Sequence, residues 1–151
     1  RFALIVVGHV YTPLQTAEVA RDFLNRLFTL SHTEAVTLGL YGDLGAGKTN
    51  FTQAIAQALG VVEVVSSPTY VIQKIYKLNN QPFDHLIHID AYRLLKSAEL
   101  SALGWAEIIA NPKNLVLVEW PERVLEVMPQ GHIKITFAHG EKDTRIIETS
   151  I

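Results

Sequence analysis

Apolar residues near the start of the chain recur with the three- and four-residue spacing of an α-helix. The pattern predicts an amphipathic helix over residues 14–28. Thr12 and Pro13 come just before the first apolar positions, and this pair is typical of a helix start, with threonine as the cap and proline at the first helical position. The residues that form the apolar face are Val19, Ala20, Phe23, Leu24 and Leu27.

Shorter apolar or alternating segments along the rest of the chain predict strands, with three further helices between them. Turn residues at positions 79–82 and at Gly140 separate two pairs of these strands, so each pair is expected to form a hairpin. The strands are expected at residues 2–7, 36–41, 70–78, 85–90, 115–118, 132–138 and 144–151. The helices are expected at residues 51–59, where Gly60 ends the helix, and at residues 97–103 and 105–110.

Strands and helices mix throughout the chain, which favours the α/β class. We expect a largely parallel central sheet with antiparallel additions and flanking helices. The sequence has 151 residues and shows no internal repeat, no low-complexity tract and no linker rich in Pro, Gly or Ser. Residues 1–151 are therefore expected to form a single domain.

Composition narrows the classes of function. The chain has no cysteine, which excludes disulfides, thiolate metal sites and a cysteine nucleophile, and fits a reducing compartment. The formal charge is −2 and the basic residues are dispersed, whereas an autonomous nucleic-acid-binding protein usually has a clustered basic face. The apolar run at residues 2–7 is too short to span a bilayer and lacks a small-residue cleavage site. We therefore expect a cytoplasmic protein with no membrane contact.

One segment matches the pattern G-x-x-x-x-G-K-[ST] at every fixed position, namely Gly42-Asp43-Leu44-Gly45-Ala46-Gly47-Lys48-Thr49. Glycines let several backbone N–H groups face one anion, and the helix that follows adds its partly positive N-terminus. Lys48 can reach the β- and γ-phosphates of a nucleotide, and the Thr49 hydroxyl can bind Mg²⁺. A predicted strand precedes the motif and a predicted helix follows it, as this chemistry requires. The nucleotide-binding residues predicted here are Asp43, Leu44, Gly45, Ala46, Gly47, Lys48, Thr49 and Asn50.

The rest of the sequence favours ATP as the nucleotide. A GTPase usually carries an Asn-Lys-x-Asp motif after a strand, and this sequence has none. Small-molecule kinases commonly gather arginines in a lid and a substrate site, whereas the arginines here are scattered. We therefore expect ATP or ADP with Mg²⁺ as cofactors. A small-molecule kinase with its own acceptor pocket is one alternative.

Two acidic residues stand at the ends of predicted strands. Asp90 follows the apolar run 86–89, and Glu119 follows the apolar run 115–118. Ligands bind at the carboxyl edge of parallel sheets, so both carboxylates are expected near the phosphate-binding segment. Mg²⁺ needs hard oxygen ligands, and an attacking water needs a hydrogen-bond acceptor to orient it. The two acids are therefore candidate catalytic and metal-binding residues.

Four segments together resemble the bacterial TsaE family, also called YjeE. Residues 42–49 are common to P-loop proteins, and three other segments carry the resemblance, in the family's order and spacing over most of the chain. Gln15-Thr16 also resembles a family feature. The resemblance implies a P-loop NTPase fold. The three specific segments are Ser67-Pro68-Thr69-Tyr70, His88-Ile89-Asp90-Ala91-Tyr92-Arg93-Leu94 and Val118-Glu119-Trp120-Pro121.

The resemblance implies an ATPase that is needed to form N6-threonylcarbamoyladenosine at position 37 of tRNAs reading codons that begin with A. Proteins of this family act with the TsaD and TsaB proteins, which carry the threonylcarbamoyl-transfer site. Contact with tRNA is therefore expected only through that complex. The ATPase is expected to be weak alone and stimulated by the partners. A nucleotide-dependent binding module without physiological hydrolysis is the other alternative.

The resemblance also implies roles for individual residues. Thr16, Thr69 and Trp120 are implied in nucleotide binding, with Thr69 in a switch-like loop near the γ-phosphate. Asp90 and Glu119 are implied to serve the metal and the attacking water between them. We assign Glu119 to the metal and Asp90 to the water, and keep Asp90 as a further candidate metal ligand.

Several neighbouring side chains also have structural interpretations. Trp120 is either a packing residue or an aromatic wall beside the nucleotide. The structural alternative for Tyr92 is a core aromatic with its hydroxyl satisfied. Arg93 is expected at the surface or in an ion pair, with a catalytic role as the alternative. His85 and His88 are expected to be structural.

Overall fold

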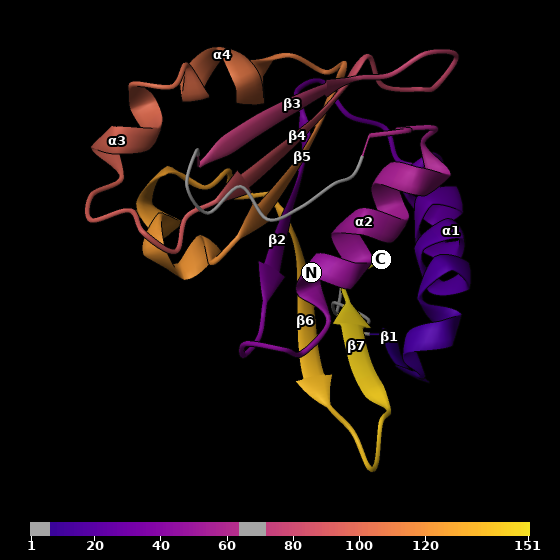
Figure 1. Cartoon of the computed structure of the whole chain (residues 1–151). Coiled ribbons are helices and arrows are strands. Elements are labelled where there is room, and N and C mark those ends of the chain that lie inside the picture. The colour runs from indigo at the N-terminus through magenta and orange to yellow at the C-terminus, as the bar shows by residue number, and fades with distance from the viewer. Residues whose placement is uncertain (1–6, 64–71) are drawn as a thin grey trace, which may run out of the picture.

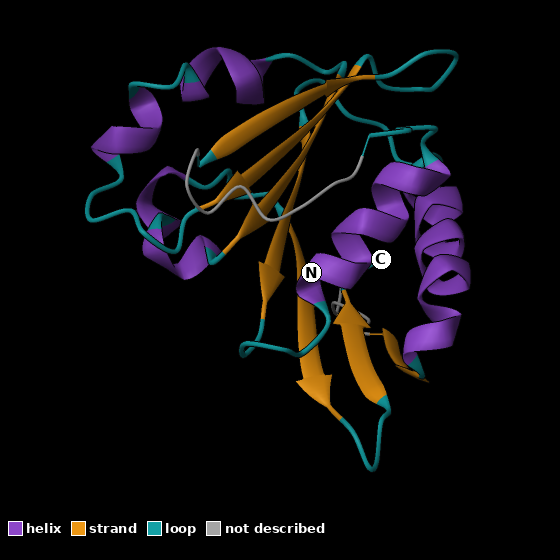
Figure 2. Cartoon of the chain, in the orientation of Figure 1, coloured by secondary structure: helices purple, strands orange, loops and turns teal. Residues whose placement is uncertain are grey.

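The chain folds into one twisted sheet with helices against both of its faces (Figure 1 and Figure 2). The structure is a computed structural model and describes residues 7–63 and 72–151. The strands in these ranges are β1 (Val7–Tyr11), β2 (Val36–Tyr41), β3 (Gln73–Lys77), β4 (His85–Asp90), β5 (Asn114–Glu119), β6 (Ile133–His139) and β7 (Arg145–Thr149). The α-helices are α1 (Thr16–Leu27), α2 (Lys48–Ala58), α3 (Ala98–Ser101) and α4 (Trp105–Ala110). Three 3₁₀ turns are η1 (Pro13–Gln15), η2 (Pro121–Arg123) and η3 (Leu125–Val127).

The strands follow the order β1-β7-β6-β2-β5-β4-β3 across the sheet. Strands β6, β2, β5 and β4 are parallel to one another, whereas β1, β7 and β3 extend the two sides by antiparallel pairing. The α/β class, the parallel centre with antiparallel additions and both predicted hairpins, β3–β4 and β6–β7, are confirmed. Because the central strands are parallel, the carboxyl ends of β2, β4 and β5 meet at one edge of the sheet.

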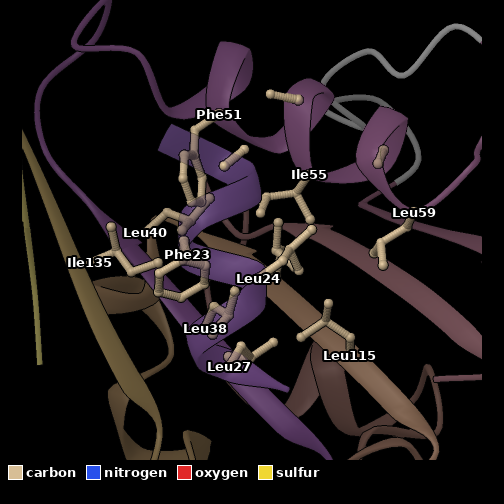
Figure 3. Close-up of a cluster of buried hydrophobic side chains, with 14 of the residues drawn as sticks. Phe23, Leu24, Leu27, Leu38, Leu40, Phe51, Ile55, Leu59, Leu115 and Ile135 are labelled. Carbon is tan, nitrogen blue, oxygen red and sulfur yellow. The ribbon is translucent and has the colours of Figure 1, made fainter. Parts of the chain in front are cut away.

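The main hydrophobic core lies between the sheet and the helices α1 and α2 (Figure 3). Leu38 and Leu40 of β2 point into this layer. Above them, Phe23 of α1 meets Phe51 of α2 edge to face, with ring centroids 5.7 Å apart. These four side chains are fully buried. The layer fixes α2 over β2, and α2 begins at the phosphate-binding segment.

Alternation along the strands decides which side chains face α2. Leu117 of β5 and Leu86 of β4 belong to the core beneath α1 and α2. Two residues further along each strand, on the same face, are Glu119 and His88, and Asp90 follows His88. Asp90 is paired with Glu119 in the register between the two strands. The two acids therefore lie side by side at the edge of the sheet that carries the phosphate-binding segment.

The opposite face of the sheet packs against α3, α4 and the segment that contains η2 and η3 (Figure 1). Trp105 of α4 is buried there, and its indole N–H donates a hydrogen bond to the carbonyl of Val127 at 2.9 Å. This contact ties the chain that follows Glu119 to the helical layer. The second core consists chiefly of Ile87, Ile89, Leu94, Leu100, Trp105, Ile108, Val116, Val118, Val124 and Met128.

The starts of two helices differ from the sequence expectation for local reasons. The first helix opens with η1, where the Thr12 N–H donates to Oε1 of Gln15 at 2.9 Å and Pro13 occupies the first helical position. Helix α2 begins at Lys48, three residues before the predicted start. Gly47 has a left-handed backbone, with φ of +110°, and serves as the residue from which α2 starts. The phosphate-binding segment thus runs directly into the helix.

The remaining expectations differ at element ends. Of the strand expected at residues 2–7, only residue 7 lies in the described ranges, where it begins β1. Residues 70–71 of the strand expected at 70–78 also lie outside these ranges, and β3 occupies Gln73–Lys77. Helix α3 is shorter than expected, because residues 102–104 form a turn that leads into α4. No helix within residues 7–63 and 72–151 has both the length and the apolar character needed to cross a bilayer.

Candidate nucleotide-binding site

The loop between β2 and α2 is held tightly against the neighbouring strand β6. Gly42 has φ of +140°, and a Cβ atom there would collide with the carbonyl oxygen of Phe137. Gly47 has φ of +110°, and a Cβ atom there would approach the Tyr11 hydroxyl at 3.3 Å. Both glycines are therefore needed for the path of this loop. The path directs the first turn of α2, with its unpaired N–H groups, toward the edge where β4 and β5 end.

A cavity of about 400 Å³ opens at this edge of the sheet. Its volume lies within the range of small-molecule sites, roughly 300–1,000 Å³. It joins the loop, the start of α2 and the ends of β4 and β5, which are distant in the sequence. The residues around it are Leu44, Gly45, Gly47, Lys48, Thr49, Asn50, Asp90, Tyr92, Glu119 and Trp120.

Lys48 is buried in the wall of this cavity, with its side chain 5% exposed. Its Nζ donates a hydrogen bond to the carbonyl of Gly42 at 2.5 Å and lies 3.8 Å from the ring centroid of Trp120. Burial lowers the pKa of Lys48, and the charges of Glu119, Glu122, Asp90 and Asp43 oppose that shift. An anion in the cavity would compensate the desolvated ammonium group, which makes Lys48 a suitable phosphate ligand.

Glu119 connects the end of β5 with the first turn of α2. The Thr49 hydroxyl donates to Oε1 of Glu119 at 3.5 Å, and Nε2 of His88 lies 2.6 Å from Oε2 of the same carboxylate. Glu119 is buried, and so is Asp90, whose Oδ1 accepts a hydrogen bond from the backbone N–H of Tyr92 at 3.0 Å. The site thus places a hydroxyl oxygen and two carboxylates beside the ammonium group of Lys48.

These oxygen donors fit Mg²⁺ bound together with a nucleotide. No group of three or more His, Cys, Asp or Glu side chains suited to hold a metal ion occurs in the described part of the chain. Mg²⁺ is commonly bound by one or two carboxylates, waters and substrate phosphates rather than by a cage of protein ligands. The Thr49 hydroxyl and the Glu119 carboxylate supply oxygens of the required kind at the side of the cavity.

Some predicted site residues do not line the cavity. Thr16 is buried, and its hydroxyl donates to the carbonyl of Pro13 at 2.8 Å. Asp43 and Ala46 belong to the loop, where the Ala46 N–H donates to the carbonyl of Asp43 at 3.2 Å, and Ala46 itself is part of the main core. Thr69 lies outside the described residues. The roles of these four residues in nucleotide binding stay predictions.

The structure bears on the interpretations left open for two aromatic residues. Tyr92 is not in the core: it is 41% exposed, lines the cavity, and its ring centroid lies 5.2 Å from that of Trp120. It leaves the core because β4 ends at Asp90, so the strand alternation no longer applies. Trp120 follows β5 in a left-handed conformation, with φ of +58°. It both packs against the second core and walls the cavity beside Lys48.

The two histidines of β4 differ from each other. His85 is half-buried at the amino end of the strand, away from the site, as a structural residue would be. His88 is fully buried and contacts Glu119, so sequence reasoning missed a neighbour of the site. The signal was present, because His88 is two residues from Asp90 on a strand and therefore faces the same side. Arg93 is exposed, as expected.

Comparison with known proteins gives consistent matches. The sequence model of the family described as "Threonylcarbamoyl adenosine biosynthesis protein TsaE" matches residues 12–147. The tRNA threonylcarbamoyladenosine biosynthesis protein TsaE of Bacillus subtilis is 39% identical over 110 residues, which cover 73% of this chain and 66% of that protein, just under two thirds. The Haemophilus influenzae protein of the same name is 32% identical over 128 residues, which cover 85% of this chain and 78% of that protein.

A solved structure resembles the fold over nearly its whole extent. The crystal structure of YdiB from Bacillus subtilis superimposes with a TM-score of 0.74 and 29% sequence identity, covering 99% of this chain and 87% of that one.

Proposed function

This chain belongs to the TsaE family, and from that membership we propose that it is an ATP-hydrolysing component of tRNA threonylcarbamoyladenosine biosynthesis. One observation supports hydrolysis above other uses of the site. A single cavity brings together the lysine and threonine of a phosphate-binding loop and two buried carboxylates from strands β4 and β5. A site that only held a nucleotide would need the loop but not both acids.

In this function, the loop and the first turn of α2 bind the phosphates. Backbone N–H groups and the Lys48 ammonium group face the β- and γ-phosphates, and Lys48 exchanges its bond with the Gly42 carbonyl for bonds with phosphate oxygens. Trp120 shields the lysine from solvent at the side of the cavity, and Tyr92 packs against Trp120. Water exclusion strengthens the attraction between the ammonium group and the phosphates.

The two carboxylates divide the remaining work. Thr49 and Glu119 hold Mg²⁺, which neutralises charge that develops on the phosphate oxygens. We assign these two residues because the Thr49 hydroxyl already lies against the Glu119 carboxylate. Asp90, at the adjacent position, accepts a hydrogen bond from the attacking water and orients its oxygen toward the γ-phosphorus. The water oxygen forms a bond to the γ-phosphorus as the bond between that phosphorus and the bridging oxygen breaks. The products are ADP and inorganic phosphate, and the proton lost by the water passes to phosphate or solvent.

The nucleotide is ATP, since the sequence lacks the Asn-Lys-x-Asp motif that reads guanine. We propose TsaB and TsaD as partners in the cytoplasm, with tRNA contacted only through them. The charge of the chain supports this arrangement, because a formal charge of −2 without a basic cluster gives little attraction for a polyanion. The ATPase would then serve the complex and would be weak in isolation.

The test is phosphate release from ATP by this protein alone and with TsaB and TsaD. We expect stimulation by the pair. Asp90→Asn and Glu119→Gln should each lower stimulated turnover by at least about 100-fold while changing ADP affinity much less, because the loop provides most phosphate contacts. Glu107→Gln, which neutralises an exposed acid on α4, is the control and should leave turnover unchanged.

Other outcomes would point to other functions. ADP formation that depends on a small-molecule acceptor would identify a kinase. Tight ATP binding with no turnover in either condition would identify a nucleotide-dependent binding module. Retained turnover in both Asp90→Asn and Glu119→Gln would contradict the catalytic role of the two acids.

A further inference from the structure

His88 is a polar residue in a position where the fold provides an apolar environment. It is fully buried, and Leu117 is its register partner on β5. Leu86, two residues earlier on the same face of β4, belongs to the main core. A leucine at position 88 would continue this layer, and burying an imidazole is favourable only if the ring has a polar partner. The structure gives His88 one such partner, the Glu119 carboxylate.

The geometry fixes which ring atom carries hydrogen. Nε2 of His88 lies 2.6 Å from Oε2 of Glu119, whereas Nδ1 is buried with no hydrogen-bond partner among the described residues. Because a buried N–H without an acceptor is unfavourable, the hydrogen belongs on Nε2, which donates to the carboxylate. The other oxygen of that carboxylate, Oε1, then faces the Thr49 hydroxyl.

We propose that His88 is a positioning residue that orients the Glu119 carboxylate for Mg²⁺ and keeps it from pairing with Lys48. This inference rests on the proposed function, because it assumes that Glu119 serves the metal. The terminal torsion of a glutamate is soft, so its two oxygens need a fixed donor to hold one orientation. A donor behind a metal ligand commonly fulfils this task, and its loss typically weakens metal affinity by about 10- to 100-fold.

Lys48 provides the reason for such a restraint. Its ammonium group shares the cavity with Glu119, and the charge of Glu119 is the largest opposing influence on its lowered pKa. A carboxylate that could turn freely would form an ion pair with Lys48. That pair would withdraw one group from phosphate and the other from the metal. With Oε2 held by His88, Lys48 instead bonds to the Gly42 carbonyl and stays available to an incoming phosphate.

The test measures ADP affinity by calorimetry with Mg²⁺ and in EDTA. The dissociation constant in EDTA divided by the dissociation constant with Mg²⁺ reports how much the metal contributes to ADP binding, and no turnover is needed to measure it. His88→Met removes the donor, and we expect it to reduce this ratio by about 10-fold. His88→Gln has an amide nitrogen that reaches the position of Nε2, so it should keep the ratio within a few-fold of wild type. Affinity in EDTA should stay at the wild-type value in His88→Gln. In His88→Met it should fall, but by less than affinity with Mg²⁺, because the released Glu119 carboxylate then pairs with Lys48.

Two further variants sharpen the comparison. His88→Asn carries an amide that is too short to reach Glu119, so it should behave like His88→Met and replaces it if the methionine variant does not fold. His85→Met changes the other histidine of β4 and should leave the ratio at the wild-type value. Thermal unfolding of each variant measures its melting temperature. A substitution that only destabilises the protein would lower this temperature without producing different dissociation-constant ratios for His88→Gln and His88→Asn.

The outcomes separate this inference from the proposed function. If His88→Asn and His88→Gln behave alike, or if both keep the wild-type ratio, His88 is only a core residue and the inference is overturned. If Glu119→Gln reduces the ratio while the His88 variants do not, the metal assignment stands and the positioning role fails. If Glu119→Gln also keeps the wild-type ratio, the metal assignment fails, and the positioning role fails with it.

Discussion

At the scale of single residues, Lys48 shows how the site is prepared for an anion. Its charge lies in a buried position, held by the Gly42 carbonyl on one side and the Trp120 ring on the other. Neither contact neutralises the charge. The carboxylate of Glu119, which lines the same cavity, is directed toward Thr49 and His88. The cavity therefore presents a desolvated cation whose best available partner is a ligand.

Replacing Lys48 should weaken ATP binding while the protein stays folded. Lys48→Ala removes charge-assisted hydrogen bonds that are worth about 1.5–3 kcal/mol in typical cases, so we expect ATP affinity to fall by about 10- to 100-fold. Calorimetric titration measures the change. Lys113→Ala, which removes an exposed lysine just before β5 at the opposite end of the parallel strands, is the matched control. Wild-type affinity in a folded Lys48→Ala protein would refute the phosphate-binding role.

The residues that sequence reasoning identified are those whose role depends on local pattern. Lys48 and Thr49 stand at fixed positions of a motif, and Asp90 and Glu119 each end an apolar run. His88 was missed because its contact with Glu119 depends on the pairing of β4 with β5. Such neighbours, from strands separated by two helices, become visible only when the register is known.

At the scale of elements, the packing of α1 on α2 supports the site without contributing to its chemistry. Phe23 and Phe51 meet edge to face, and Phe51 also contacts Phe137 of β6, with ring centroids 5.4 Å apart (Figure 3). One aromatic cluster therefore joins both helices to the strand against which the loop at Gly42 is held. The position of the loop depends on this layer being intact.

Removing one ring of this aromatic cluster tests how much the layer stabilises the fold. Phe23→Ala removes a fully buried side chain from α1, and we expect the free energy of unfolding to fall by about 3–5 kcal/mol. Chemical denaturation measures the loss. Leu14→Ala in the neighbouring turn η1 is the control, because Leu14 is 96% exposed and its replacement should change stability by no more than about 0.5 kcal/mol. Equal effects of the two substitutions would contradict the packing described here.

Most elements could be predicted from periodicity, and the exceptions have physical causes. The apolar face of α1 follows directly from residue spacing, because one side of the helix is buried. The strands at 36–41 and 85–90 are largely apolar runs, because both faces of these strands are buried. The start of α2 could not be found in this way. Lys48, Thr49 and Asn50 carry no apolar pattern, and the helix begins at Lys48 because of the backbone turn at Gly47.

At the scale of the whole molecule, the site opens to the surface at one edge of the sheet. Leu44 and Tyr92 line the cavity and are 74% and 41% exposed, so two large side chains stand at its opening. A protein that docked at this edge of the sheet would contact the same loop and strand ends that bind the nucleotide. Binding of the nucleotide and of the partner would then be coupled.

The coupling can be measured from either ligand. We expect the affinity for the TsaB–TsaD pair to differ between ATP, ADP and no nucleotide, by a factor in the usual range of about 5- to 150-fold. By linkage, the pair should change ATP affinity by the same factor as ATP changes affinity for the pair. Titrating the pair under the three conditions measures the first factor, and titrating ATP with and without the pair measures the second. Identical affinities, with unchanged ATPase activity, would remove the case for a nucleotide-gated component.

The order of strands also bears on how the protein emerges from the ribosome. Strand β2, which carries the phosphate-binding loop, has β5 and β6 as its neighbours, through pairs such as Val36 with Leu115 and Leu38 with Ile133. All residues of the loop are synthesised long before either neighbour exists. Such distant pairings close large loops and form late. A nascent chain therefore carries a complete nucleotide motif that has no fixed shape until most of the polypeptide has left the exit tunnel.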